Sequence, residues 1–194
     1  MTVDLYDFDK TVFPVDSSTA FWLFCMKRHP KIIKHLPRQI LGAIKFFLKK
    51  INLTQFKEEF FSFLKSVDGE KEASLFWEKN GDRIFEWFRP TENDAVTVVC
   101  SASPEFEIRP ILEKLGVQII LGTRVNPKTG KITGENCKRE EKVRRIKEVV
   151  GDCEFRNAYT DNPKSDAPLL SLAENKFVVI DKKACKTELK EHRR

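Results

Sequence analysis

Residues 5–11 read Leu-Tyr-Asp-Phe-Asp-Lys-Thr, so that two carboxylates follow directly on a short apolar run. The run begins at Val3 and has the character of a strand that is buried on both faces of a parallel sheet. Asp7 and Asp9 are separated by one residue, so their side chains share a face of an extended backbone. Neighbouring carboxylates repel each other, and proteins usually tolerate this where the acids hold a hard cation or perform chemistry. The pair alone is equally compatible with two surface acids in a solvated loop.

Three further segments carry polar groups at the end of a predicted strand or near the start of a predicted helix. Ser101 ends a second apolar run, and Asp161 and Asp166 follow a third predicted strand. Lys142 lies near the start of an amphipathic helix. Ligands of open α/β sheets bind at the carboxyl ends of the strands, so we expect these groups to meet at one site.

The four segments, in this order, resemble the motifs of the haloacid dehalogenase (HAD) superfamily, and within it the phosphoserine phosphatase-like branch. The resemblance spans nearly the whole chain. The matching residues are Asp7, Asp9 and Thr11 for the first motif, Ser101 for the second, Lys142 for the third, and Asp161 and Asp166 for the fourth.

The resemblance implies an α/β fold with a Rossmann-like three-layer core, a parallel sheet and an inserted helical cap. The core is expected over residues 1–15 and 90–194 and the cap over 16–89, a segment that looks helical and is rich in Phe and Trp. The candidate helices of this segment cover residues 17–28, 30–50, 53–66 and 70–88. Residues 125–132 are typical of a hairpin with Gly130 in its turn.

The resemblance also implies roles for the motif residues. Asp7 would attack phosphorus and form an aspartyl-phosphate, while Asp9 would protonate the leaving oxygen and later activate water. Thr11 would help to orient Asp9. Ser101 and the amide of Ala102 would hold phosphoryl oxygens.

A magnesium ion and a lysine complete the implied site. Mg²⁺ would be held by Asp7, the backbone carbonyl of Asp9, and Asp161, while Asp166 would act on Lys142 or on metal-bound water. Phosphate chemistry requires such cations. A carboxylate about 4 Å from a phosphate charge is repelled by roughly 4 kcal/mol per charge pair at an effective dielectric near 20. A divalent cation with an ammonium opposite cancels that repulsion.

Several residues have a second interpretation. Asp166 is also suited to capping a helix, and Ser101 to starting the turn into the next helix. Lys138 is an alternative to Lys142 for the third motif. Asp16 occupies the position of a substrate-contacting Glu in phosphoserine phosphatases, but it also begins a good helix N-cap, which is the favoured role. Because Asp16 has a shorter side chain than the Glu of phosphoserine phosphatases, it weakens any inference that phosphoserine is the substrate.

Length, hydropathy and cysteines restrict the class of protein. A chain of 194 residues accommodates one core domain with a modest insertion. The opening residues do not resemble a signal peptide, and no apolar run is long enough to cross a membrane. The five cysteines are scattered and indicate free thiols in a reducing cytoplasm, not a disulfide framework or a zinc site.

Positive charge is concentrated in the first half of the predicted cap. Residues 17–57 contain nine Lys or Arg and no acid, whereas the whole chain has a net charge of +6. Apolar residues recur there at helical spacing, and a basic amphipathic stretch can lie on anionic lipid. We therefore consider peripheral contact between residues 27–50 and the inner face of a membrane, although a solvated basic face is the favoured interpretation. Nucleic acid is a poor fit, because no aromatic stacking platform accompanies the charge.

We therefore predict a cytoplasmic, Mg²⁺-dependent phosphomonoester hydrolase that acts through an aspartyl-phosphate on a phosphorylated small molecule or lipid phosphate. One alternative is phosphoserine phosphatase itself. Another is a peripheral lipid phosphatase, since the layout also resembles bacterial phosphatidylglycerophosphate phosphatases, whose equivalent segment is a membrane anchor. A third is a binding protein on the same fold that has lost its activity.

Overall fold

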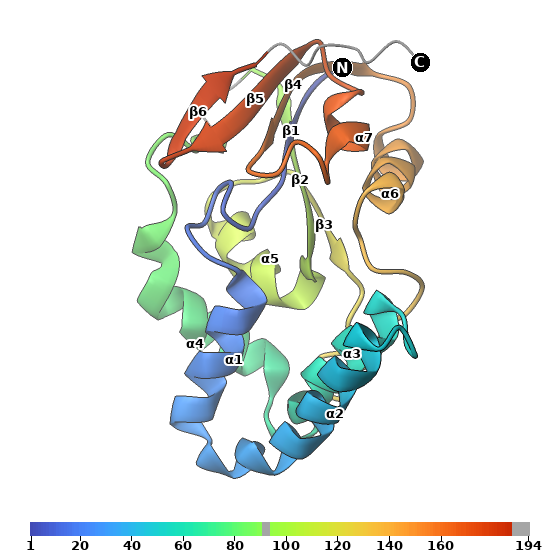
Figure 1. The fold of residues 1–194 in the computed structure, drawn as a ribbon. Coiled ribbons are helices and arrows are strands. Elements are labelled where there is room, and N and C mark those ends of the chain that lie inside the picture. Colours follow the sequence, from blue (N-terminus) through green and yellow to red (C-terminus); the bar gives the residue numbers. More distant parts are fainter. Residues whose placement is uncertain (91–93, 188–194) are drawn as a thin grey trace.

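The computed structural model describes residues 1–90 and 94–187, and a six-stranded sheet forms the upper part of the molecule as drawn in Figure 1. The strand order is β3-β2-β1-β4-β5-β6, and every pairing is parallel except that of β5 with β6. The predicted α/β fold with a mainly parallel sheet is confirmed. The strands are β1 (Thr2–Tyr6), β2 (Val96–Pro104), β3 (Ile119–Thr123), β4 (Glu154–Thr160), β5 (Asn175–Ile180) and β6 (Lys183–Lys186).

Strand β1 is buried because it lies between β2 and β4 and has helices on both sides. Val3 and Leu5 face one apolar cluster and Tyr6 faces the other, as the alternation of a strand requires. Asp4 is the polar exception in this strand. Its carboxylate accepts hydrogen bonds of 3.0 and 2.8 Å from the guanidinium of Arg156, so the buried charge is paired.

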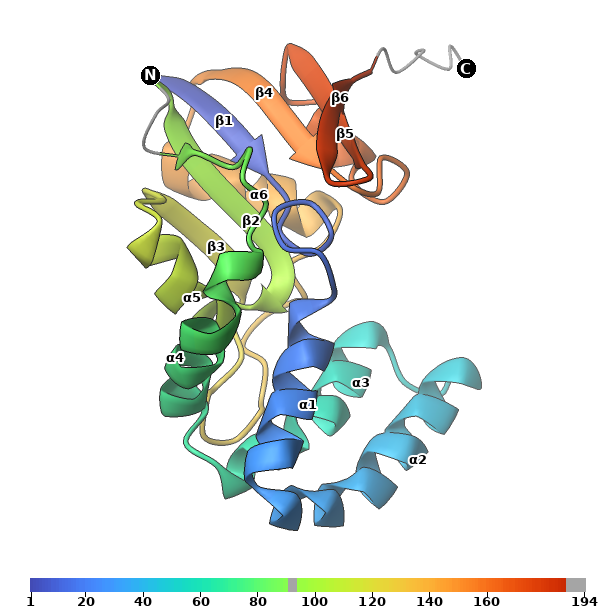
Figure 2. The ribbon, with the colours of Figure 1, turned by 90° about the vertical axis from the view of Figure 1, so that its left-hand side faces the viewer.

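Helices cover both faces of the sheet and give the predicted three layers (Figure 2). One face packs against α6 (Glu140–Val150) and α7 (Ala167–Leu170), which contribute Ile146, Leu169 and Leu170 to the core. The other face packs against α5 (Glu105–Lys114), with α4 (Gly69–Asn80) alongside it. Trp77 of α4 joins these two helices by donating to the carbonyl oxygen of Glu107 at 2.5 Å.

The segment between β1 and β2 is helical, as predicted, but its boundaries differ. Helix α1 (Ser17–Arg28) agrees with the prediction, whereas the predicted helix over 30–50 is divided into the 3-10 helix η1 (Pro30–His35) and α2 (Leu36–Phe47). The helix restarts because proline occupies the first turn of each element, where its missing N–H costs nothing.

Two other predicted helices are also shorter. The one over 53–66 is divided into α3 (Leu53–Phe60) and the 3-10 helix η2 (Phe61–Ser66). The one over 70–88 ends at Asn80, whose side chain donates to the carbonyl of Phe76, and is followed by the 3-10 helix η3 (Gly81–Arg83). The division of the chain into a core and a cap stays a prediction.

The predicted hairpin over 125–132 is present as a tight turn with a single antiparallel bridge between Val125 and Ile132. The amide of Asn126 donates to the carbonyl of Lys131 at 2.8 Å, and Gly130 has a φ of +74°. A Cβ on Gly130 would lie 2.3 Å from the carbonyl oxygen of Phe61. The turn is therefore pressed against η2, and only glycine fits this position.

We expect Gly130→Ala to lower the free energy of unfolding more than Gly134→Ala does. Both glycines have a positive φ, which costs alanine about 1–2 kcal/mol, but a Cβ on Gly134 would meet nothing within 4 Å. The clash at Gly130 adds overpacking, typically about 1–3 kcal/mol. Urea unfolding of the two variants measures the difference, and equal losses of stability would contradict the close approach to Phe61.

Candidate active site

The carboxyl ends of β1, β2 and β4 meet at one cavity of about 160 Å³, as expected from the polar residues at the ends of the predicted strands. All the predicted site residues line it except Thr11, which lies behind Asp7. The lining consists of Asp7, Asp9, Lys10, Asp16, Ser101, Ala102, Lys138, Lys142, Asp161, Asn162, Ser165 and Asp166.

Asp7 follows β1 and is held from three directions. Its amide donates to the carbonyl of Tyr159 at 2.9 Å, which continues the pairing of β1 with β4 by one residue. Its carboxylate accepts 2.6 Å from Lys142 Nζ on Oδ1 and 3.2 Å from Thr11 Oγ1 on Oδ2. Burial raises the pKa of Asp7, while the ammonium of Lys142 opposes that rise by favouring the ionised form.

Thr11 has a different partner from the one predicted. Its hydroxyl donates to Asp7 and accepts a hydrogen bond of 2.9 Å from the amide of Asp161, so it contacts neither oxygen of Asp9. The prediction that Thr11 orients Asp9 is wrong in this respect. The hydroxyl instead links the end of β1 to the loop after β4.

Lys142 is the lysine that contacts the acids. It lies in the first turn of α6 with its side chain 3% exposed, 2.6 Å from Asp7 Oδ1 and 3.1 Å from Asp166 Oδ1. Burial would lower the pKa of Lys142, but the carboxylates of Asp7 and Asp166 outweigh burial and raise it above its ordinary value. The lysine therefore stays protonated at neutral pH. Lys138 also borders the cavity, but it is exposed to solvent.

Asp161 and Asp166 lie at the two ends of the loop that joins β4 to α7. Asp166 is at the N-cap position of α7, but its side chain does not cap the helix; Oδ2 accepts 2.7 Å from Thr160 Oγ1, and Oδ1 faces Lys142. Asp161 is partly buried at the cavity wall. Burial and the nearby Asp7 carboxylate raise the pKa of Asp161. Both acids line the cavity, and Asp166 is the one that also contacts Lys142.

Asp9 is held by neutral groups instead of a cation. Oδ1 accepts 2.8 Å from the amide of Ser17, and Oδ2 accepts 2.5 Å from Ser103 Oγ. Burial and the neighbouring Asp16 carboxylate raise the pKa of Asp9 to about 6, although the bonds from Ser103 and Ser17 oppose the rise. Asp16 itself accepts 2.7 Å from the amide of Thr19 and caps α1, the role favoured by its sequence.

Ser101 and Ala102 form the wall that β2 contributes. Ser101 is buried, and its Oγ accepts 3.0 Å from the amide of Ser103, which is also the turn-forming contact considered from the sequence. The carbonyl of Ala102 accepts bonds of 2.7 Å from Lys57 Nζ and from Thr123 Oγ1. The strand continues past Ser101 to Pro104, so these residues keep extended backbone at the cavity.

Three polar residues near the site were not identified from the sequence. Ser103 contacts Asp9, and Lys57 of α3 reaches across to β2. Glu107 is fully buried, which raises the pKa of its carboxyl well above the usual range. No local pattern marks these residues, because each becomes close to the site only through packing of helices on the sheet.

A second cavity of about 200 Å³ adjoins the first. It shares Asp9, Asp16 and Ala102 with the first cavity and extends toward Phe56, Phe60 and Phe61. Burial lowers the pKa of Lys57, which lines it, to about 8, although the carboxylates of Asp9 and Asp16 oppose the shift. An organic group attached to a phosphate in the first cavity would have space on this side.

The donor set of the first cavity suits a hard cation that keeps part of its water. Among residues 1–90 and 94–187, no group of three His, Cys, Asp or Glu side chains is arranged to hold a metal. Mg²⁺ usually binds through one or two carboxylates and retains several waters, so a three-acid cage is not required. Asp7 and Asp161 both line the cavity and would supply carboxylate oxygens to such a cation, and the charge of Asp7 adds to burial in raising the pKa of Asp161.

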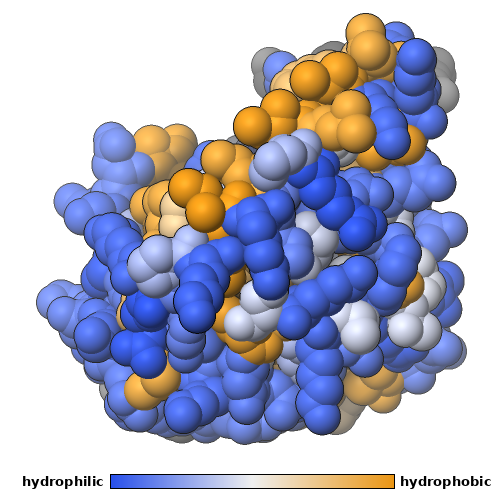
Figure 3. Space-filling view, turned by 90° about the horizontal axis from the view of Figure 1, so that it is seen from below, coloured by the Kyte–Doolittle hydropathy of each residue, from blue (hydrophilic) through white to orange (hydrophobic). Residues whose placement is uncertain are grey.

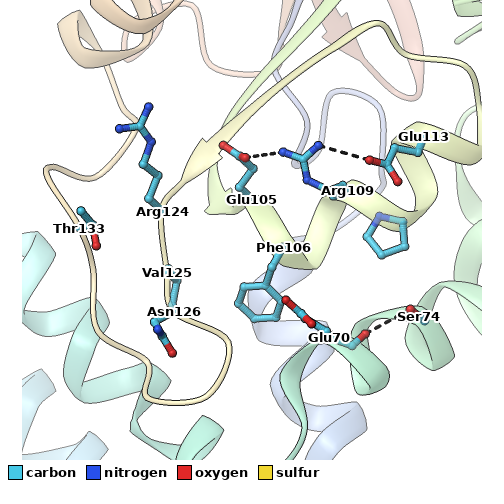
Figure 4. A pocket seen from close by; sticks show the side chains of 11 residues that line it. Glu70, Ser74, Glu105, Phe106, Arg109, Glu113, Arg124, Val125, Asn126 and Thr133 are labelled. Carbon is cyan, nitrogen blue, oxygen red and sulfur yellow. Dashed lines mark hydrogen bonds and ion pairs between the residues drawn. The ribbon is translucent and has the colours of Figure 1, made fainter.

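A wider groove elsewhere on the surface lacks this chemistry (Figure 4). It has a volume of about 610 Å³ and lies between α4, α5 and the segment from Arg124 to Thr133. Its Arg109 is paired with Glu105 and Glu113 of the same helix. None of the predicted site residues lines it, so the acidic cavity is the candidate active site.

Comparison with known proteins shows which proteins the chain is similar to. The chain is 28% identical to Protein CicA of Caulobacter vibrioides over 191 residues, which cover 88% of this chain and 82% of that protein. A Bordetella pertussis protein of unknown function has a similar structure, with a TM-score of 0.66 and 21% identity over 90% of this chain and 88% of that one. A substrate-bound phosphoserine phosphatase has a TM-score of 0.57 and 22% identity over 90% and 83% of the respective chains.

A family model covers most of the chain as well. The model of haloacid dehalogenase-like hydrolases matches residues 5–171, from β1 through the loop and helix that follow β4. The matched range includes every residue placed around the acidic cavity. The chain therefore belongs to the family of haloacid dehalogenase-like hydrolases.

Proposed function

We propose that the protein is a Mg²⁺-dependent phosphomonoester hydrolase that acts through an aspartyl-phosphate on Asp7. The observation that carries this proposal is the buried ammonium of Lys142, 2.6 Å from Asp7 in a cavity that Asp161 and Ser101 also line. A carboxylate must approach a phosphate against like-charge repulsion, and a fixed cation beside it lowers that barrier. The family membership and the fold shared with phosphoserine phosphatase support the same chemistry.

In the proposed reaction an oxygen of Asp7 attacks phosphorus, and the bond from phosphorus to the alcohol oxygen breaks. Asp9 donates its proton to that leaving oxygen and then, as a carboxylate, accepts a proton from the water that hydrolyses the acyl phosphate. Mg²⁺ held by Asp7, the carbonyl of Asp9 and Asp161 would stabilise the phosphoryl charge when bound. Ser101 and the amide of Ala102 would orient the phosphoryl oxygens.

The raised pKa of Asp9 suits this double role. A group with a pKa of about 6 is close to its titration point near neutral pH, so it can both donate and accept a proton. Asp7, in contrast, faces an ammonium that favours the charged, nucleophilic form. Two acids separated by one residue thus differ because their neighbours differ.

A second candidate function is hydrolysis of a lipid phosphate at an anionic membrane, which the surface of α2 favours. This helix turns its polar Gln39 inward, where Nε2 donates 2.7 Å to the carbonyl of Phe60. Most of its large apolar side chains are exposed to solvent, and Phe47 is 82% exposed. Figure 3 shows hydrophobic side chains gathered on the projecting part of the molecule where α2 lies. The exposed residues of this apolar face are Ile33, Ile40, Leu41, Ile44, Phe47 and Leu48.

Basic side chains surround this apolar face. Lys31, Lys34, Lys45, Lys49 and Lys50 are exposed in or beside η1 and α2. Each Lys or Arg near an anionic bilayer contributes about 1 kcal/mol of attraction. A second copy of the chain would bring like charges together, so we propose an anionic lipid surface as the partner. No helix among residues 1–90 and 94–187 has the length and apolar character needed to cross a bilayer.

We expect the purified protein to hydrolyse p-nitrophenyl phosphate with Mg²⁺ and to lose this activity in excess EDTA. Asp7→Asn removes the nucleophile and should lower kcat by at least about 10³-fold. Asp152→Asn is the matched control, since Asp152 is exposed in the turn between α6 and β4 and should retain full activity. Undiminished turnover by Asp7→Asn, with its fold verified by circular dichroism, would refute the proposed nucleophile.

Substitution of the two candidate lysines separates their roles. Lys142→Met removes the charge that touches Asp7 and should lower kcat by at least about 100-fold. Lys138→Met changes an exposed lysine at the border of the cavity and should have a much smaller effect. Steady-state kinetics of both variants give the comparison, and a larger loss for Lys138→Met would reverse the assignment.

Vesicle sedimentation tests the membrane proposal. We expect the protein to sediment with vesicles containing phosphatidylglycerol at low salt, and to be released as salt screens the charges. Phe47→Gln should weaken the binding, whereas Val149→Gln should not, because Val149 is an exposed apolar residue of α6, away from the apolar face of α2. Equal binding of wild type and Phe47→Gln, equal binding to neutral phosphatidylcholine vesicles, or self-association through this face would each contradict the proposal.

A further inference from the structure

We propose that Ser103 is a positioning residue for Asp9, and that its hydroxyl holds the proposed general acid in the orientation needed to protonate the leaving oxygen. This inference rests on the proposed function, because it assigns a role within the same reaction. Ser103 does not belong to any of the four motifs, and it comes near Asp9 only because β2 continues past Ser101.

The carboxylate of Asp9 is held at both oxygens by different elements. Ser103 Oγ, near the end of β2, donates to Oδ2 at 2.5 Å. The amide of Ser17, at the start of α1, donates to Oδ1 at 2.8 Å. With one donor on each oxygen the carboxyl group cannot rotate without breaking a bond. The Ser17 contact uses backbone, so only the Ser103 contact depends on the identity of a side chain.

Neighbouring serines determine the direction in which Ser103 donates. Its oxygen accepts 3.0 Å from Ser17 Oγ and 3.3 Å from Ser18 Oγ. A hydroxyl has one proton and two acceptor positions, so these two contacts leave its proton for Asp9. Ser103 and Ser17 are buried, at 2% and 0% exposure, which limits competition from water. A carboxylate can only accept, so donation to Asp9 accounts for the one proton of Ser103.

The backbone around Asp9 lies outside the strands of the sheet. Beyond Asp7 the chain leaves the sheet, and Lys10 adopts a φ of +59° in a loop that leads to α1. Within this loop, Asp9 forms an isolated β-bridge with Phe13. A proton donor that is displaced by about 1 Å can lose on the order of 100-fold in rate, so the placement of this side chain matters.

The role predicts a dependence on the leaving group. An alkoxide leaving from an alkyl phosphate needs a proton in the transition state, whereas p-nitrophenolate is a weak base and leaves with little help. Loss of Ser103 should therefore slow alkyl phosphates far more than p-nitrophenyl phosphate. A purely structural role would lower both rates by the same factor, since it would reduce the amount of active enzyme.

The experiment compares wild type and Ser103→Ala on p-nitrophenyl phosphate, phenyl phosphate and an alkyl phosphate. We expect kcat/KM, which reports the step in which the leaving oxygen departs and not the later hydrolysis of the acyl phosphate, to fall on the order of 10- to 100-fold for the alkyl ester and less than about 3-fold for p-nitrophenyl phosphate. Ser62→Ala is the matched control, because Ser62 is also buried and its Oγ has no hydrogen-bond partner within the described part of the chain. It should change neither rate.

The outcomes separate this inference from the proposed function. An active wild type with equal loss on all three esters, or with no loss, would overturn the role of Ser103 alone. A wild type that hydrolyses none of the esters would overturn the proposed function and the inference with it. Should Ser103→Ala fail to fold, Ser17→Ala provides a second test, because it removes a hydroxyl that donates to Ser103. This variant should also slow esters with poor leaving groups more than p-nitrophenyl phosphate, to a smaller extent. An equal effect on all three esters would again overturn the role of Ser103.

Discussion

The buried ammonium of Lys142 between Asp7 and Asp166 is the interaction on which the site depends. A lysine and two carboxylates would each be costly to bury alone, and removing one partner from such a group leaves an uncompensated charge. The three residues come from the end of β1, the start of α6 and the loop after β4. Their pairing therefore fixes how α6 sits on the sheet, and it places a positive charge where a phosphate would bind.

The neighbouring acids show how one loop can support two kinds of chemistry. Asp7 faces a cation, whereas Asp9 faces a hydroxyl and an amide, and burial raises the pKa of Asp9 to about 6. The difference arises from β2 and α1, which bring Ser103 and Ser17 to Asp9, and from α6, which brings Lys142 to Asp7. The motif supplies two identical side chains, and their surroundings make them chemically different.

The helices between β1 and β2 line a cavity on one side and expose an apolar face to solvent on the other. On the inner side, α3 sends Lys57 to β2 and lines the second cavity with Phe56 and Phe60. On the outer side, α2 leaves its apolar residues in solvent and packs against α3 through Gly42, where a Cβ would lie 2.6 Å from Glu59 Cβ. The requirement for close packing at Gly42 determines which face of α2 points inward.

The sequence by itself determined the α/β class, the strand ends that carry acids, the cap of α1 at Asp16 and the free state of the cysteines. These follow from patterns that extend over a few residues: apolar runs, capping residues and spacing between carboxylates. Only the tertiary structure decided that Lys142 and not Lys138 meets Asp7, that Thr11 bonds to Asp7 and not to Asp9, and that Ser103 holds Asp9. It also decided that the apolar face of α2 is exposed. Periodicity shows that a helix has an apolar side, but the direction of that side, like the partner of a polar group, depends on contacts between segments far apart in the chain.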